Sequence, residues 1–318
     1  MKTDCIRYLE KRRYGNRGGG IKYFVDCSVY RSHPERIQTE LLLRNVRKPH
    51  DISIIRAVAT DDTIQKKNKR IVVKIFPNRR GSNQEYDIGE FLHQEHLPGF
   101  VRYLCQFSCF DDTVNTATTV TESQPSQTFS APICQGTATQ ENKKVVLVMP
   151  FIPNGSIEKH VWCEDNLPLL KNLLVHTVLS LAMAFDRVGF VHGDLHAGNI
   201  LFKPTQQREI TYSFAHTTFT LGTMGYKIVL VDFEKAKLRD PSVSILSYWN
   251  NLLFMCKHVE TALLYYDDYY ISWENTAILG FLRKTPPALD ALPQFLDLMQ
   301  TSQFTFHAKE THAYNPDV

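Results

Sequence analysis

The most informative segment of this chain is Phe190-Val-His-Gly-Asp-Leu-His-Ala-Gly-Asn-Ile-Leu-Phe202. Apolar residues begin and end it, whereas its centre is polar and contains two glycines. Because glycine lets the backbone turn sharply, the pattern predicts a tight polar loop between buried segments. The loop supplies four candidate functional side chains: His192, Asp194, His196 and Asn199.

A second apolar run, Ile228-Val-Leu-Val-Asp-Phe-Glu234, ends in a carboxylate. Its composition predicts a buried strand with Asp232 at its end. An Asp five residues before an Asn, followed by a strand-terminal Asp, is the arrangement that phosphoryl transfer uses. The pattern therefore predicts Asp194 as the base that accepts a hydroxyl proton. It predicts Asn199 and Asp232 as ligands of a magnesium ion.

These segments resemble the catalytic core of the protein-kinase-like superfamily, in the form found in its atypical members. Haspin, aminoglycoside kinases and choline kinases carry a similar Asp-Leu-His-x-x-Asn loop. The resemblance implies an α+β, bilobal protein-kinase-like fold. It places a small β-rich N-lobe at 1–149 and a mainly helical C-lobe at 150–318, with the catalytic loop at 190–202. It also implies ATP and Mg²⁺ as cofactors and a Ser or Thr hydroxyl of a protein as the acceptor.

The resemblance assigns the ATP-binding lysine to Lys74, in a β-branched run from Arg70 to Phe76 that is similar to the family's Val-Ala-Ile-Lys strand. A glutamate on the next helix pairs with this lysine in the family. The spacing from 83 to 96 predicts that helix, in which Glu85 fits the apolar face best and Glu90 is the alternative. The family's glycine loop would fall at 47–51, which contains no glycine, whereas the glycine-rich 15–20 lies too far upstream. The phosphate-binding loop therefore stays unassigned.

The run from Lys144 to Met149 predicts another buried strand, and the connector after it resembles the hinge between kinase lobes. This resemblance implies that Met149 lies at the back of the adenine pocket and that the backbone at Phe151 and Ile152 contacts the adenine edge. Upstream, 111–142 is rich in Thr, Ser, Gln and Pro, which is the composition of a disordered loop.

An apolar stripe at helical spacing predicts the clearest helix at 167–188, directly before the polar loop. The remaining pattern predicts strands at 53–59, 100–110 and within 210–221. It predicts helices at 156–163 and 244–266 and two within 272–302. The polar end, 304–318, is expected to be mobile.

Two loop positions depart from the common Ser/Thr kinases. His196 stands where those kinases carry a lysine that touches the γ-phosphate, so its imidazole either takes that role or stabilises the loop. Gly193 replaces the arginine that pairs with a phosphorylated activation loop, and no Ala-Pro-Glu follows Asp232. We therefore expect activity that does not depend on activation-loop phosphorylation.

Composition bounds the remaining possibilities. The chain has 318 residues, 43% hydrophobic and 22% charged, as is typical of a globular protein. A net charge of +3 does not favour nucleic acid as the main partner. No run of 18 apolar residues occurs, so no membrane span is expected. The N-terminus lacks the apolar core of a signal peptide, and seven cysteines without a Cys-x-x-Cys pair favour free thiols. We expect an intracellular location, cytoplasmic or nuclear.

Two alternatives remain open. A small-molecule kinase of the aminoglycoside or choline type has a similar loop sequence. Kinases of that class usually add helices to the C-terminal lobe that enclose the acceptor, and about 160 C-terminal residues leave little room for them. A pseudokinase scaffold is favoured by Asp-Phe-Glu in place of Asp-Phe-Gly and by the missing glycine loop. Retention of Lys74, Asp194, Asn199 and Asp232 counts against the scaffold, because a scaffold needs none of them for chemistry.

Overall fold

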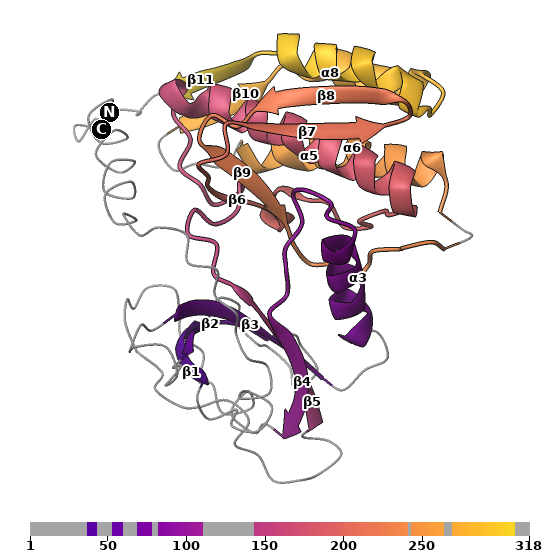
Figure 1. The fold of residues 1–318 in the computed structure, drawn as a ribbon. Helices are drawn as coiled ribbons and strands as arrows, with labels where there is room; N and C mark the ends of the chain where they lie inside the picture. The colour runs from indigo at the N-terminus through magenta and orange to yellow at the C-terminus, as the bar shows by residue number, and fades with distance from the viewer. Residues whose placement is uncertain are drawn as a thin grey trace, which may run out of the picture. The chain divides into compact units, whose positions relative to one another are not determined.

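A computed structural model describes residues 37–42, 53–59, 69–77, 82–110, 143–240, 243–263 and 269–308. Small antiparallel sheets and several helices make up the fold (Figure 1), which confirms the α+β class. The chain divides into two compact units. The first contains the described residues of 20–95 and 101–151, and the second contains 96–100 and the described residues from Ile152 onward.

The first unit contains a five-stranded sheet in the order β1-β2-β3-β5-β4, with every neighbouring pair antiparallel. Its strands are β1 (Ile37–Leu42), β2 (Ser53–Ala59), β3 (Lys69–Pro77), β4 (Cys105–Phe110) and β5 (Lys143–Pro150). Ile71, Val73 and Ile75 are buried at alternate positions of β3, as expected for β-branched residues on a pleated sheet. β1 was not predicted, and β4 is shorter than the strand expected at 100–110.

A helix accompanies this sheet. α3 (Ser82–Gln94) contacts β4 and β5 and confirms the helix expected at 83–96 (Figure 1). Ile88 and Leu92 are buried, and Glu85 lies on the same face because three and seven residues complete about one and two helical turns. The helix therefore brings a carboxylate to the face that packs against the sheet.

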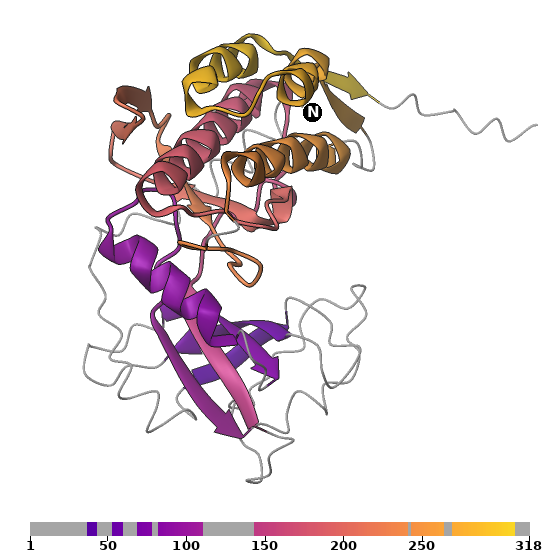
Figure 2. The same ribbon diagram turned by 90° about the vertical axis from the view of Figure 1, so that its right-hand side faces the viewer.

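The second unit is built around α5 (Leu167–Val188), the helix that the apolar stripe predicted. Figure 2 shows α5 beside α6 (Ile245–Leu263) and α8 (Leu292–Thr301), both of which it contacts. The helix ends at Gly189, whose φ of 61° is left-handed and whose N–H bonds to carbonyl oxygens of the last turn. This ending directs the chain into the polar loop at Phe190.

Short antiparallel pairs complete the second unit. β6 (Ile200–Pro204) pairs with β9 (Tyr226–Leu230), β7 (Glu209–Phe214) with β8 (Thr217–Gly222), and β10 (Tyr269–Trp273) with β11 (Phe304–Ala308). Its described segments also form α7 (Thr276–Lys284) and the 3₁₀ turns η2 (Glu164–Asn166), η3 (Ala197–Asn199) and η4 (Leu289–Ala291).

Two expectations about secondary structure and order in this unit were wrong. No helix forms at 156–163, which the structure describes in full, because its backbone bonds to β6 instead: Ile157 N–H donates to the carbonyl of Ile200 at 2.9 Å, and Ser156 bridges to Leu201. The polar C-terminal end is not mobile throughout, since residues 304–308 form β11 and the Phe304 ring stacks on Trp273 at 5.2 Å. The predicted loop 111–142, the glycine-rich segment 15–20 and the segment 47–51 lie outside the described residues.

Cys105 and Cys256 are buried free thiols, whereas Cys163 is disulfide-bonded, so the expectation of free thiols is wrong at that position.

Within the described ranges, one segment, Glu164–Val188, is long and apolar enough to cross a membrane. Of its most apolar stretch 83% is buried in the protein, as for an ordinary core helix, so length and composition here are weak evidence for a span.

Candidate functional site

A buried ion pair lies in the first unit. Lys74 Nζ of β3 donates to Glu85 Oε2 of α3 at 2.7 Å, and the two side chains are 3% and 0% exposed. Tyr103 donates its hydroxyl to the other carboxylate oxygen, Oε1, at 2.6 Å. Of the two glutamates left open by the sequence, Glu85 and not Glu90 is therefore the partner of Lys74.

The surroundings fix the ammonium group of Lys74 in place. Burying a charge is costly unless the charge is paired and hydrogen-bonded, and both oxygens of Glu85 have donors. The ammonium also lies 4.8 Å from the centroid of the Phe76 ring, within the range of a cation–π contact. The structure thus holds a lysine rigidly on the central strand of the sheet.

The residues expected at the adenine pocket lie where β5 ends. Met149 is buried in β5, Phe151 is half-buried, and Ile152 is buried at the start of the second unit. The Ile152 carbonyl accepts the Gly155 N–H at 3.1 Å and so closes a turn. Their contact with adenine stays a prediction.

The polar loop of the second unit presents an amide oxygen. Asn199 Nδ2 donates to the backbone carbonyl of Asp194 at 2.9 Å, which fixes which end of the amide is nitrogen. The Asn199 carbonyl accepts the Val231 N–H at 3.2 Å. Within the part of the chain that the structure describes, Oδ1 of Asn199 accepts no hydrogen bond and is free to bind a ligand.

The carboxylate of Asp194 is engaged on one oxygen. Lys235 Nζ donates to Oδ2 at 2.8 Å, and the Asp194 and Lys235 side chains are 27% and 64% exposed. This hydrogen bond raises the pKa of Lys235, and the charges of Asp194, Asp232 and Glu234 add to the effect. Sequence reasoning missed Lys235, although its place three residues after Asp232 was a usable signal.

Asp232 follows β9 in a strained backbone conformation. Its φ of 69° is left-handed, which is uncommon outside glycine, and such residues are concentrated at functional sites. Phe233, the next residue, is fully buried and packs edge-on against Phe190 at 5.8 Å. The buried ring anchors the chain directly beside the half-buried carboxylate.

His192 connects the polar loop to the segment that carries Asp232. The imidazole is fully buried, and Nε2 donates to the Val231 carbonyl at 3.0 Å. Burial lowers the pKa of His192 to about 4, against the opposing effect of that hydrogen bond and of the nearby Asp232 and Asp194 charges. The ring is therefore neutral at pH 7, and its role is to tie the loop to the backbone beside Asp232.

His196 is used within the loop. Nδ1 accepts the Gly198 N–H at 3.1 Å and caps η3, and the ring lies 5.3 Å from that of His258. Of the two roles that the sequence left open, the loop-stabilising contact is therefore present. A contact with phosphate stays a prediction.

Gly193 and Asn251 hold the entry to the loop. Asn251 of α6 accepts the Gly193 N–H through Oδ1 at 2.9 Å and donates to the Ser247 carbonyl at 2.8 Å. Gly193 has a left-handed φ of 77°, and a Cβ here would overlap the carbonyl oxygen of Lys235. No sequence motif pointed to Asn251, because its contact depends on the packing of α6 beneath the loop.

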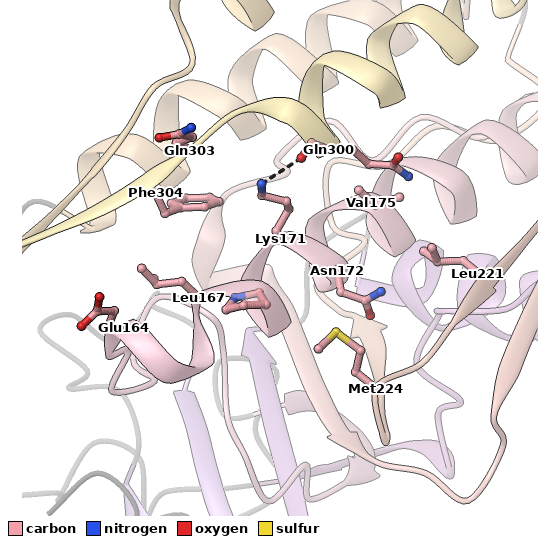
Figure 3. Close-up of a pocket in the computed structure, with 11 residues that line it drawn as sticks. Glu164, Leu167, Lys171, Asn172, Val175, Leu221, Met224, Gln300, Gln303 and Phe304 are labelled. Carbon is pink, nitrogen blue, oxygen red and sulfur yellow. Dashed lines mark hydrogen bonds between the residues drawn. The ribbon is translucent and has the colours of Figure 1, made fainter. Parts of the chain in front are cut away.

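Ligand-sized space occurs elsewhere in the second unit. A cavity of about 480 Å³ opens between α5, the β7–β8 hairpin and the end of α8 (Figure 3). Lys171 lines it and donates to the Gln300 carbonyl at 2.9 Å and to the Ser302 carbonyl, so its charge caps the end of α8. None of the predicted site residues lines this cavity.

The candidate metal ligands are few. Among the residues that the structure describes, no cluster of three or more His, Cys, Asp or Glu side chains could hold a metal ion. That Asn199 of the polar loop and Asp232 after β9 bind a metal ion stays a prediction.

No protein-family model matches this chain. The chain is 39% identical over 86 residues to an uncharacterised protein of Caenorhabditis elegans, a match that covers 27% of this chain and 29% of that protein. It is 32% identical over 75 residues to the serine/threonine-protein kinase haspin of Mus musculus, which covers 24% and 10%. It is 29% identical over 79 residues to the haspin homolog of Drosophila melanogaster, which covers 25% and 13%. The chain thus spans less than a third of these relatives. The similarity to the two haspin proteins indicates a kinase-like relationship over about a quarter of the chain.

Proposed function

We propose that this chain is an ATP-dependent phosphotransferase, and specifically an atypical Ser/Thr protein kinase that does not depend on activation-loop phosphorylation. The observation that carries the proposal is the arrangement of the polar loop. Asp194 keeps one carboxylate oxygen without a partner among the described residues, and Asn199 likewise keeps its amide oxygen. The backbone of Asn199 bonds to Val231, the residue before Asp232. A base and two oxygen ligands are therefore built on one hydrogen-bonded framework.

The donor set fits magnesium. Mg²⁺ prefers hard oxygen ligands, keeps several waters, and is usually held by one or two protein groups together with substrate phosphates. Asn199 and Asp232 offer one amide oxygen and one carboxylate, which matches that pattern.

The proposal includes the fold and its division. We assign the two units to the lobes of a bilobal kinase-like fold, with the N-lobe at 1–149 and the C-lobe at 150–318. A five-stranded sheet with a buried Lys–Glu pair and a helical unit with the polar loop support this assignment, as does the partial similarity to haspin. An intracellular location and a protein partner that carries a Ser or Thr acceptor belong to the same proposal.

Each side chain has a defined task in this proposal. ATP supplies the phosphoryl group, and Mg²⁺ neutralises charge on its oxygens. Lys74 holds the α- and β-phosphates from the position that Glu85 and Tyr103 fix. Asp194 accepts the proton of the acceptor hydroxyl, a contribution of about 10²- to 10⁴-fold in rate. Asn199 and Asp232 would hold the metal ion, and His192 keeps the two segments that carry them together through its hydrogen bond to Val231.

The test is transfer of radiolabelled γ-phosphate in the presence of Mg²⁺. The purified chain receives a mixed protein acceptor, aminoglycosides and choline, each assayed separately. We expect label on protein, abolished in Asp232→Asn and retained in Asp290→Asn, an exposed carboxylate remote in sequence from the loop. Label on an aminoglycoside or choline would establish the small-molecule kinase instead. No transfer and no nucleotide binding would leave the scaffold.

A further inference from the structure

Lys235 lies beside the proposed base, and the proposed function assigns it no role. Its backbone is fixed on both sides, since Ala236 N–H bonds to the Phe233 carbonyl at 3.1 Å, and Val191 and Lys237 exchange hydrogen bonds at 2.9 and 2.8 Å. Its long side chain is 64% exposed, and its ammonium donates to Asp194 Oδ2. A cation on this short connection therefore lies at the proposed base and closely follows the proposed metal ligand Asp232.

The loop is shaped to admit this segment. A Cβ at Gly193 would overlap the Lys235 carbonyl oxygen, so any larger residue would push the two backbones apart. The Gly193 N–H is held by Asn251 of α6 at 2.9 Å, which prevents the loop from moving away. The absence of a side chain at 193 thus brings the backbone of Lys235 against the loop.

The loop at 190–202, described in full, offers no free cation of its own beside Asp194. His196 uses Nδ1 to accept the Gly198 N–H and packs its ring against His258. His192 is buried, neutral at pH 7 and bonded to Val231. In the loose transition state of phosphoryl transfer, negative charge is spread over the three equatorial oxygens of the transferred group, and a preorganised cation beside them stabilises it. Lys235 carries an exposed ammonium that meets this need.

We propose that Lys235 is a catalytic residue of the phosphotransferase: it holds Asp194 in the free protein and contacts the γ-phosphoryl oxygens when the nucleotide is bound. This inference rests on the proposed function. In the step, the acceptor hydroxyl oxygen forms a bond to the γ-phosphorus, and the bond from that phosphorus to the β–γ bridging oxygen breaks. The bridging oxygen leaves with the electron pair as part of ADP, and the hydroxyl proton passes to Asp194. Lys235 exchanges no proton and neutralises charge on the transferred group.

The experiment compares the affinities for ATP and ADP by calorimetry with Mg²⁺, alongside kcat and KM, for wild type, Lys235→Ala and Lys235→Arg. Only ATP carries a γ-phosphate, so Lys235→Ala should lower the ratio of ATP to ADP affinity by about 10-fold, the effect of one charge-assisted hydrogen bond. It should lower kcat by about 10²-fold with the acceptor KM unchanged. Lys235→Arg should keep most of the affinity ratio. Lys284→Ala, at an exposed lysine of α7, should match wild type.

The outcomes separate the inference from the function on which it rests. If wild type transfers phosphate but Lys235→Ala keeps the wild-type ATP to ADP ratio, the assignment is overturned whatever the change in kcat, because Lys235 then acts only on Asp194. If wild type binds no nucleotide and transfers no phosphate, the proposed function fails and the role of Lys235 fails with it.

Discussion

The ammonium of Lys74 lies 2.7 Å from a carboxylate oxygen of Glu85, and both side chains are buried within one unit of the protein. A buried ion pair contributes little net stability relative to apolar residues, because desolvation offsets most of the attraction. In this protein the pair, together with the Tyr103 hydroxyl, fixes the charged group of Lys74 in place. This relationship is the main support in the first unit for a role of Lys74 at phosphate.

Removing one partner of this pair should destabilise the protein. Glu85→Ala leaves the Lys74 ammonium buried without its counter-charge, which should lower the free energy of unfolding by about 3 kcal/mol. Glu90→Ala, on the same helix, should change it by less than about 0.5 kcal/mol. Urea denaturation measures both. The double variant Lys74→Met with Glu85→Leu should regain most of the loss, and equal effects of Glu85→Ala and Glu90→Ala would contradict this account.

Gly193 should tolerate no side chain. Gly225 is its matched control, because it has a similar left-handed φ of 80° against 77° but no atom within 4 Å of the position that a Cβ would take. Gly225→Ala should therefore lower stability by about 1 kcal/mol for backbone strain alone. Gly193→Ala should cost roughly 1–3 kcal/mol more, because its Cβ overlaps the Lys235 carbonyl. Thermal unfolding of both variants tests this, and equal losses would show that the close approach is absent.

Stability should fall in mild acid because of His192. The folded state lowers the pKa of His192 from 6.5 to about 4, so the unfolded chain binds more protons between these values. The contribution of His192 is fully present above pH 6.5 and is lost as the pH falls toward 4, by about 3 kcal/mol. Urea denaturation across this range, without nucleotide or metal, should show a shallower pH dependence for His192→Gln than for wild type. His216→Asn, at an exposed histidine, should follow wild type, and an unchanged profile in His192→Gln would refute the assignment.

Phosphatase treatment should leave turnover unchanged. Gly193 cannot provide the arginine charge that would bind a phosphorylated activation loop. Its backbone instead bonds to Asn251 and lies against the Lys235 carbonyl. We therefore expect the purified chain to transfer phosphate at the same rate before and after dephosphorylation, as measured by initial velocities with saturating ATP. A chain that becomes inactive on dephosphorylation would show that a phosphorylated group elsewhere controls it.

Local patterns in the sequence were sufficient for much of the fold. The helix predicted at 167–188 and the strands predicted at 53–59 and 70–76 have strong periodicity or β-branched composition. They form at those positions, with β3 one residue longer at each end. The pairing of Lys74 with Glu85 was also among the predicted choices, because the spacing of α3 places Glu85 on its apolar face. Glu90 lies off that face and is only half-buried.

Other features depended on contacts between distant segments. The segment 156–163 looks helical in isolation, but the hydrogen bonds of Ile157 and Ser156 go to β6. β10 and β11 pair across about thirty residues, and the sequence of either short strand does not identify a partner so far along the chain. Lys235 and Asn251 reach the polar loop only because the chain after Asp232 and helix α6 pack against it. Motif spacing pointed to the neighbourhood of Lys235 but not to its contact with Asp194, and it gave no indication of Asn251.

The most direct measurement of the central claim compares Asp194→Asn with wild type in one preparation, for ATP affinity and for phosphate transfer in a single turnover. The substitution keeps the size and the hydrogen-bonding shape of the side chain but removes its capacity to take a proton. The account predicts that ATP affinity stays within about twofold while transfer slows by at least about 10²-fold. Transfer at the wild-type rate in Asp194→Asn would contradict the assignment of Asp194 as the base of a phosphotransferase.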